Sequence, residues 1–177
     1  RTAELVQANL KLSELAEKDA LTGVYNRHKF NILLEEHFSE AMNHGKQLSM
    51  MMMDVDEFKK YNDHHGHVEG DHLLRSIAQL ISNLIPEGVI FARYGGEEFV
   101  WLLPGYSKQE AYLLGDRIRQ RVREAKMGKN EPGVSISLGV AELTADQPVS
   151  KAMDLVEIAD KRLYKSKLKG RNTITLD

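Results

Sequence analysis

The chain has 177 residues, a length that fits one domain with a short appendage. Its 24 Lys and Arg against 26 Asp and Glu give a net charge of −2, which disfavours a nonspecific binder of nucleic acid or of an anionic membrane surface. It has no cysteine, so disulfides, thiolate metal sites and cysteine nucleophiles are excluded, and a reducing cytoplasm suits it.

The chain begins at Arg1, and no signal-peptide pattern follows. We therefore expect a fragment of a larger protein, with an upstream sensory domain outside it. The longest apolar run, Leu48–Met53, is far short of the roughly 20 residues that a membrane helix needs. We expect a cytoplasmic fragment with no direct membrane contact, and any membrane anchor of the parent protein would lie in the missing part.

The first predicted element is an amphipathic helix over residues 1–19. Its apolar residues Leu5, Ala8, Leu12 and Leu15 recur with heptad spacing. Two heptads are fewer than a firm coiled-coil assignment needs, so two interpretations stay open. The helix either packs on its own domain or is the end of a dimerising linker.

The rest of the chain alternates between helical and strand patterns. Helices are expected over residues 26–42, 57–64, 71–84, 107–125 and 150–168. Strands are expected over residues 48–55, 89–94, 97–103, 134–142 and 172–176. Gly95-Gly96 is suited to the positive φ angles of a tight hairpin turn. This order predicts an α+β fold with one central, mostly antiparallel sheet flanked by helices.

Acidic residues follow two of the predicted strands. Asp54 and Asp56 stand at the carboxyl end of the buried strand, and Glu97 and Glu98 follow the glycine pair. If these strands are neighbours, Asp54 and Glu97 converge. Carboxylates held together repel unless a cation lies between them, and hard oxygen ligands select Mg²⁺ or Mn²⁺.

Basic residues gather near the C-terminus. The segment from Ser150 to Arg171 carries +4, with seven Lys and Arg against three Asp and Glu, and the remainder carries −6. A solvated last helix turn is also rich in cations. However, Lys167 and Arg171 lie four apart across a helix end and a turn at Gly170, which suits the binding of a phosphate. Acids for a metal ion and bases for a phosphate favour nucleotide phosphoryl chemistry.

Other phosphate-binding, hydrolase and metal-binding motifs are absent from the sequence or poorly matched. There is no G-x-x-x-x-G-K-[ST] loop, no G-x-G-x-x-G loop and no nucleophile elbow. His64, His65, His67 and His72 crowd one region. Their spacing lacks an ordered ligand pair and no cysteine is available, so a zinc site is disfavoured.

The segment Arg93-Tyr94-Gly95-Gly96-Glu97-Glu98-Phe99 strongly resembles the signature of the GGDEF family of diguanylate cyclases, in its GGEEF form. Further motifs match in order over about residues 18–177. They are Asp19-Ala20-Leu21-Thr22 with Asn26-Arg27, Asp54-Val55-Asp56-Glu57-Phe58-Lys59, Asn62-Asp63, Gly66-His67, Gly70-Asp71, Ala159-Asp160, Leu163-Tyr164, Lys167 and Gly170-Arg171-Asn172.

The resemblance implies the condensation of two GTP into cyclic di-GMP with release of two pyrophosphates. The reaction would depend on Mg²⁺, with Mn²⁺ as a possible substitute, and would take place in a homodimer whose two domains each present one GTP. The implied fold is similar to the palm of nucleotide cyclases and polymerases. Residues 1–18 would form a linker or signalling helix, and 19–177 the catalytic output domain at the C-terminal end of a larger bacterial signalling protein.

The resemblance also implies roles for individual residues. Asp54, Glu97 and the backbone carbonyl of Val55 would hold the metal, and Lys59 would help to neutralise the triphosphate in the transition state. The implied substrate-binding set is Phe58, Asn62, His67, Asp71, Gly95, Gly96, Lys167 and Arg171.

Within that set, Asn62 and Asp71 would recognise guanine, because one carboxylate can accept from both N1–H and the 2-amino group. The glycine pair would let the backbone approach the nucleotide closely. The general base stays open between Glu97, Glu98 and a water molecule acting on a metal-bound hydroxyl.

The sequence departs from the family pattern just before the signature. Many members carry an R-x-x-D motif for product inhibition, and Pro86 and Val89 occupy those positions here. We expect the domain to escape that form of inhibition. Glu57 stands where an apolar or small residue is more usual.

Two other functions remain as alternatives to an active diguanylate cyclase. A catalytically silent domain that binds GTP or cyclic di-GMP would be favoured by degenerate signature residues, and none is seen. A related cyclase that uses ATP, or one ATP and one GTP, would call for a change at Asn62 or Asp71, and both are present.

Overall fold

The computed structural model describes residues 1–146 and 148–177, and all side chains in them except those of residues 13–15. The helices are α1 (Thr2–Glu17), α2 (Arg27–His44), α3 (Phe58–His65), α4 (His67–Leu84), α5 (Lys108–Glu124) and α6 (Ala152–Leu168). The strands are β1 (Leu48–Val55), β2 (Ile90–Arg93), β3 (Glu98–Pro104), β4 (Ile136–Glu142) and β5 (Ile174–Thr175). Each element expected from the sequence is present.

The five strands form one sheet in the order β2-β3-β1-β4-β5. The central strand β1 pairs antiparallel with both β3 and β4, and β2 pairs antiparallel with β3. The short pairing of β4 with β5 is parallel, and an isolated parallel bridge joins Tyr25 to Ala92 of β2. The predicted α+β fold with a mostly antiparallel sheet is confirmed.

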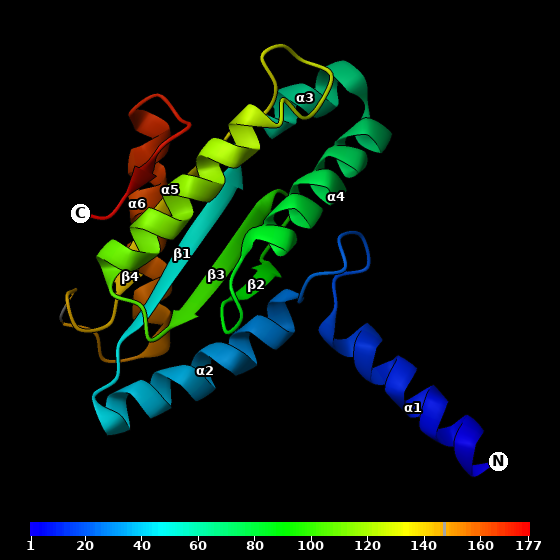
Figure 1. Ribbon diagram of the computed structural model, residues 1–177, viewed down its shortest axis with the longest axis vertical. Coiled ribbons are helices and arrows are strands. Elements are labelled where there is room, and N and C mark those ends of the chain that lie inside the picture. The colour runs from blue at the N-terminus through cyan, green and yellow to red at the C-terminus, as the bar shows by residue number, and fades with distance from the viewer. Residues whose placement is uncertain (147) are drawn as a thin grey trace.

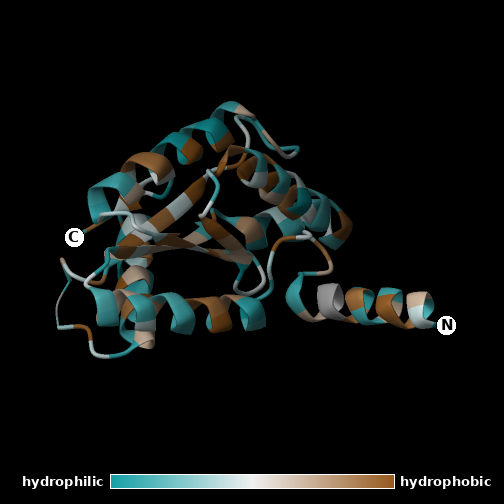
Figure 2. Ribbon diagram, turned by 60° about the horizontal axis from the view of Figure 1, so that its bottom comes forward, coloured by the Kyte–Doolittle hydropathy of each residue, from teal (hydrophilic) through white to brown (hydrophobic). Residues whose placement is uncertain are grey.

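Helices cover both faces of the sheet (Figure 1). Because side chains alternate along a strand, Met51 and Met53 of β1 pack in the core under α3, α4 and α5, whereas Met50 and Met52 pack against α2 and α6. All four are at most 1% exposed, so β1 is buried on both faces. The hydrophobic strands lie between helices whose outer turns are hydrophilic (Figure 2).

Helix α6 packs unusually close to β4. A Cβ on Gly139 would lie 2.2 Å from the carbonyl oxygen of Ala159 and from the amide nitrogen of Leu163, so only glycine fits there. The buried Ser166 hydroxyl donates to the carbonyl of Leu138 at 2.7 Å. These contacts fix the last turn of α6, which carries Lys167, against the sheet.

Helix α1 projects away from the domain (Figures 1 and 2). Its apolar residues Leu5, Val6, Leu10 and Leu12 are between 51% and 64% exposed. The interpretation that this helix packs on its own domain is therefore wrong over these residues. The side chain of Leu15, which belongs to the predicted heptad stripe, lies outside the described residues. No helix in the described part of the chain is long and apolar enough to cross a membrane.

The expected positive φ angles of Gly95 and Gly96 are wrong. Neither glycine has a positive φ, and the amides of Tyr94 and Gly95 both donate to the carbonyl of Glu98, at 2.8 and 3.2 Å. The connection is thus a four-residue loop over 94–97, which does not need the left-handed angles of a two-residue turn.

The expected start of α4 at residue 71 is also wrong. The helix begins at His67, directly after Gly66 with φ 88, and it contains Gly70. A glycine in this position suggests a break in the helix when only the sequence is known. In the structure Gly70 instead serves a close contact between α3 and α4.

Candidate active site

The acids of the two strands meet at one edge of the sheet. Asp54, at the end of β1, pairs with Glu98 at the start of β3, and the amide of Val55 donates to the carbonyl of Glu97 at 3.2 Å. The expected neighbourhood of the two strands is therefore confirmed. Glu98, rather than Glu97, is the residue directly opposite Asp54.

Asp54 is the most perturbed carboxyl group of this site. It is 5% exposed, and burial raises its pKa to about 6 even though the ammonium of Lys167 lowers it; the charges of Glu97 and Glu98 raise it further. One oxygen, Oδ2, accepts from Lys167, whereas the buried Oδ1 has no partner among the described residues. An unpaired, buried carboxylate oxygen beside two more carboxylates is a position that a cation would stabilise.

A fourth acid, Asp160 on α6, is part of the same electrostatic cluster. Burial raises the pKa of Glu98, and the nearby charge of Asp160 raises it further. Asp160 precedes Lys167 by seven residues and so shares its helix face. Sequence reasoning assigned no role to Asp160, although the Ala159-Asp160 pair is among the motifs that match the family.

The protein side chains alone do not enclose a metal ion. Within the part of the chain that the structure describes, no three His, Cys, Asp or Glu side chains are arranged to hold one. The available oxygens are Asp54 Oδ1, the hairpin glutamates and the Val55 carbonyl. Such an incomplete set suits Mg²⁺, which is usually bound through one or two carboxylates together with substrate phosphates and water.

Asn62 lies where α3 meets α4. Its Oδ1 is buried and has no partner in the described structure. A Cβ on Gly70 would lie 1.7 Å from this oxygen and 3.2 Å from the ring of Phe58. Glycine at position 70 therefore allows the Asn62 amide to lie directly against α4.

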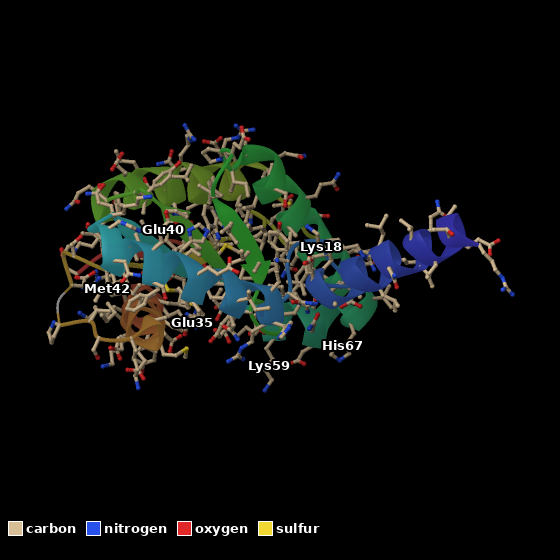
Figure 3. The ribbon with its side chains drawn as sticks, turned by 90° about the horizontal axis from the view of Figure 1, so that it is seen from below. Lys18, Glu35, Glu40, Met42, Lys59 and His67 are labelled. Carbon is tan, nitrogen blue, oxygen red and sulfur yellow. The ribbon has the colours of Figure 1, made fainter. Side chains whose placement is uncertain are left out.

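The other residues expected to bind substrate near α3 and α4 differ in exposure. Asp71, Lys59 and His67 are exposed, and Figure 3 shows Lys59 and His67 projecting from the same side of the molecule. The ring of Phe58 is only 8% exposed and belongs to the hydrophobic core. Any contact of Phe58 with substrate would therefore involve its backbone more than its ring.

The C-terminal basic run does not form one patch. Lys167 contacts Asp54, and the exposed side chain of Arg171 makes no hydrogen bond or ion pair with any described residue. The other pairings lie elsewhere: Arg162 with Asp146, Lys165 with Asp177 and Lys169 with Thr175. Of the six bases in residues 161–171, Lys167 thus contacts the acidic edge, and Arg171 has an exposed side chain without a partner among the described residues.

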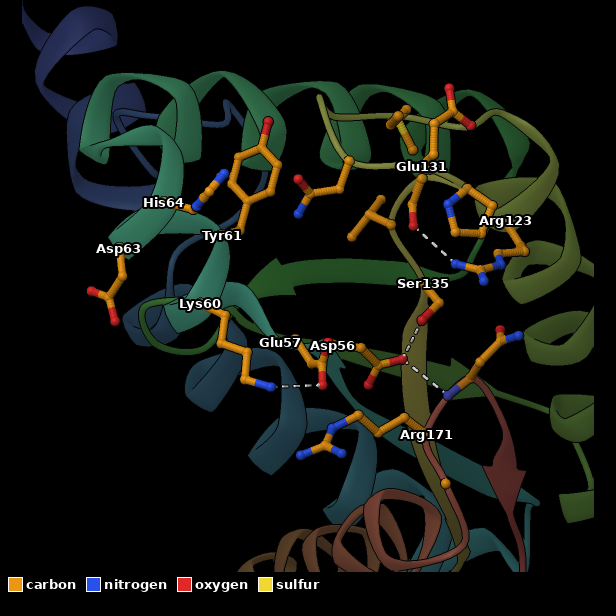
Figure 4. Close-up of a pocket in the computed structure, with 17 residues that line it drawn as sticks. Asp56, Glu57, Lys60, Tyr61, Asp63, His64, Arg123, Glu131, Ser135 and Arg171 are labelled. Atoms are coloured by element: carbon orange, nitrogen blue, oxygen red, sulfur yellow. Dashed lines mark hydrogen bonds and ion pairs between the residues drawn. The ribbon is translucent and has the colours of Figure 1, made fainter.

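A cavity of about 1040 Å³ lies next to this edge (Figure 4). Lys60 and Tyr61 of α3 line it, together with Glu57 just before that helix, Arg171 and residues of the loop before β4. Asn62, Asp71 and the glycine hairpin do not line it. The cavity therefore adjoins the basic side of the site and does not contain the residues expected to bind guanine. Glu57, for which the sequence offers no physical reason, is exposed there with φ 54.

A family model described as diguanylate cyclase, GGDEF domain, matches residues 16–173. The chain belongs to the GGDEF family. It is 38% identical over 174 residues to diguanylate cyclase A of Treponema denticola, a match that covers 95% of this chain and 46% of that protein. The chain thus spans about half the length of this curated relative and of others that it matches.

Solved structures agree with the GGDEF assignment. The coiled coil and GGDEF domain of DgcB from Caulobacter crescentus, in complex with c-di-GMP, superposes with a TM-score of 0.88 at 29% identity and covers 99% of this chain and 95% of that one. The active GGEEF domain of a diguanylate cyclase from Vibrio cholerae has a TM-score of 0.79 at 31% identity. The match covers 85% of this chain and 96% of that one. The predicted family and palm-like fold are confirmed. The roles of single residues and the division of the chain after residue 18 stay predictions.

Proposed function

We propose that this GGDEF domain is a diguanylate cyclase that joins two GTP into cyclic di-GMP. In each step the ribose 3′-hydroxyl of one GTP loses its proton and attacks the α-phosphorus of the other, and pyrophosphate leaves. The observation that carries the proposal is the unpaired, buried Oδ1 of Asp54 beside Glu97 and Glu98. The other oxygen of Asp54, Oδ2, accepts a hydrogen bond from Lys167.

In this proposal Asp54, Glu97 and the Val55 carbonyl hold Mg²⁺, or Mn²⁺ in its place. The bound cation would neutralise charge on the triphosphate and on the attacking hydroxyl. Lys167 would then leave Asp54 and pair with phosphate oxygens, together with Lys59 and Arg171. Each of these cations contributes most where negative charge builds up in the transition state.

The general base is proposed to be Glu97 or Glu98. Both stand next to Asp54, and burial and Asp160 raise the pKa of Glu98, which brings it closer to the range in which a carboxylate accepts a proton efficiently. A metal-bound hydroxyl that releases its proton to water is the remaining route. A Cβ on Gly96 would meet no atom within 4 Å, so the backbone there is open to a nucleotide.

Guanine recognition is proposed for Asn62 and Asp71. Asp71 can accept from N1–H and the 2-amino group together, whereas adenine offers no such pair of donors. The unpaired Asn62 Oδ1 would gain a donor when the base binds. An ATP-using cyclase is therefore the weaker alternative.

One domain holds one GTP, so the proposed catalytic unit is a homodimer. The exposed apolar residues of α1 suit a coiled-coil linker that brings two domains together. We place this unit in the cytoplasm, C-terminal to a sensory domain in the parent protein.

We also propose that the domain lacks the common R-x-x-D form of product inhibition. Pro86 and Val89 supply neither the guanidinium nor the carboxylate of that motif. Initial rates with added cyclic di-GMP test this point. Strong inhibition at low micromolar product, an affinity of about 8 kcal/mol, would contradict it.

The decisive experiment is to incubate the protein with GTP and Mg²⁺ and to identify the product by mass spectrometry. Cyclic di-GMP and pyrophosphate are expected, and ATP in a parallel reaction should give no cyclic dinucleotide. A protein that binds GTP but forms no product would be a silent binding module, and the proposal would fail.

A further inference from the structure

Asp56 is the one acid of the Asp54-Val55-Asp56 run with no role so far. Its side chain accepts three hydrogen bonds: Oδ2 from the Ser135 hydroxyl at 2.7 Å and from the amide of Asn172 at 3.0 Å, and Oδ1 from the Ser137 hydroxyl at 2.6 Å. Its own amide donates to the carbonyl of Ser135 at 3.0 Å. Asp56 therefore joins the end of β1 to the start of β4 and to the turn after α6.

The turn after α6 has an unusual backbone. Three successive residues have positive φ angles: Gly170 at 113°, Arg171 at 66° and Asn172 at 46°. Such angles are unfavourable for residues other than glycine, so the surrounding structure must hold them in place. The bond from the Asn172 amide to Asp56 provides one of the restraints.

A second restraint comes from α5. Arg119 donates through Nη1 to the carbonyl oxygen and to Oδ1 of Asn172, at 3.2 and 3.0 Å. Arg119 is itself held by Asp116 at 2.8 Å. Asn172 is thus bound from two sides, by Asp56 and by Arg119, and the residue before it in the chain is Arg171.

The side chain of Arg171 is exposed, without a partner among the described residues, and lies at the same end of the cavity as Asp56, Glu57 and Lys60 (Figure 4). A cationic group on a fixed backbone loses less conformational entropy when it binds an anion than one on a mobile loop. The restraints on Asn172 therefore prepare Arg171 for a phosphate.

We propose that Asp56 is a positioning residue that orients Arg171 toward the GTP triphosphate, and that it is not a metal ligand. Both of its oxygens already accept hydrogen bonds, in contrast to the unpaired Oδ1 of Asp54. The inference rests on the proposed function, since the anion that meets Arg171 is taken to be the triphosphate of GTP.

Two substitutions of Asp56 separate positioning from metal binding. In Asp56→Asn the remaining oxygen can still accept from Ser135 and from the Asn172 amide, and the new amide group can donate to the Ser137 hydroxyl. A positioning role therefore survives in Asp56→Asn and is lost in Asp56→Ala. A metal ligand needs the negative charge, so that role would be lost in both variants.

The experiment measures the binding of a non-hydrolysable GTP analogue and of GMP by calorimetry in the presence of Mg²⁺. Asp56→Ala and Arg171→Ala should each lower the affinity for the analogue about tenfold, a loss typical of one charged hydrogen bond. GMP lacks the β- and γ-phosphates, so its affinity should not change. Asp56→Asn should stay within about threefold of wild type.

The double variant Asp56→Ala/Arg171→Ala should bind the analogue no more weakly than Arg171→Ala, because the first residue acts through the second. Additive losses, equal losses for GMP and the analogue, or a loss in Asp56→Asn as large as in Asp56→Ala would each overturn the proposal. If wild type itself binds neither nucleotide, the proposed function fails, and the positioning role fails with it.

A further variant covers the case in which Asp56→Ala does not fold. Arg119→Ala removes the other restraint on Asn172. It should lower the affinity for the analogue about threefold and leave the affinity for GMP unchanged. Arg117→Ala, an exposed arginine on the same helix, is the matched control and should bind both like wild type. Identical behaviour of the two arginine variants would count against the proposal.

Discussion

Arg93 joins Asp19, just beyond α1, to the hairpin that carries the signature glutamates. Its Nη1 donates to Asp19 Oδ1 and Oδ2 at 3.3 and 3.2 Å, and its Nε and Nη2 donate to the carbonyl of Gly96 at 3.0 and 2.8 Å. Asp19 also accepts from the amide and hydroxyl of Thr22. Although burial alone would raise the pKa of Asp19, these bonds hold it below its usual value. One side chain thus connects the segment just after α1 to the candidate active site.

Arg93→Ala should lower kcat about tenfold or more while KM changes little, because the loop that holds Glu97 loses a charged tether. Asp19→Asn, which keeps the bonds to Thr22, should lower kcat by a smaller factor. Steady-state rates with GTP, together with melting temperatures to confirm folding, test this. An unchanged kcat in Arg93→Ala would show that the tether does not matter for turnover.

Glu97→Gln keeps the size of the side chain and removes its charge. We expect turnover to fall about a hundredfold or more, through weaker Mg²⁺ binding, with a fold close to wild type. Activity measured over a range of Mg²⁺ concentrations, alongside a thermal melt, provides the check. Product formation at the wild-type rate would refute a metal role for Glu97.

The raised pKa of Asp54 predicts a pH dependence of stability. The pKa of about 6 in the folded state lies above the ordinary aspartate pKa of 3.8, so the folded state binds the proton more tightly than the unfolded state does. The contribution of Asp54 to the free energy of unfolding is therefore full below about pH 4 and is lost as the pH rises through about 6.

Mg²⁺ should reverse this loss, since a cation favours the ionised carboxylate. The rise in melting temperature on adding MgCl₂ should grow between about pH 4 and pH 7. Asp54→Asn should have neither the pH dependence nor the Mg²⁺ response over this range. A metal response that is equal at all pH values in wild type would contradict Asp54 as the ligand.

Gly70→Ala tests the contact between α3 and α4. In a helix interior alanine is normally preferred to glycine by about 1 kcal/mol. Here the new methyl group would meet Asn62 Oδ1, so we expect about tenfold weaker GMP binding and poorer discrimination against adenine. The double variant with Asn62→Ala should be no worse than Asn62→Ala alone. Tighter or unchanged GMP binding in Gly70→Ala would mean that the amide is not used.

Paired substitutions in α1 test its role in association. Leu5→Glu with Leu12→Glu places charges at two positions of the apolar stripe and should shift the protein toward monomer and lower the specific activity at low concentration. Gln7→Glu with Asn9→Glu adds the same charge at polar positions and is the control. Sedimentation equilibrium and rates over a dilution series measure both effects. A rate proportional to protein concentration throughout would argue against a catalytic dimer.

The pairing of the sheet and the meeting of Asp54 with the hairpin acids were predictable, because apolar runs that end in acids indicate buried strands and a glycine pair indicates their connection. The residue that pairs with Asp54 on the neighbouring strand was not predictable, because the register of the two strands depends on the length of the loop that connects β2 and β3. The restraints on Arg171 could not be foreseen either, because they unite Asp56, Arg119 and Asn172 from distant parts of the chain. Likewise, the purpose of Gly70 is visible only once α3 and α4 pack.

The four consecutive methionines of β1 offer a spectroscopic handle on the whole domain. Met50 and Met52 contact the layer that contains α2, which adjoins α1, whereas Met51 and Met53 contact the layer that contains α3 and α4. Isotope labelling of the methionine methyl groups would therefore place two NMR probes on each side of one rigid strand. Changes that begin at α1 and changes that begin at the candidate active site could be followed separately in a single spectrum.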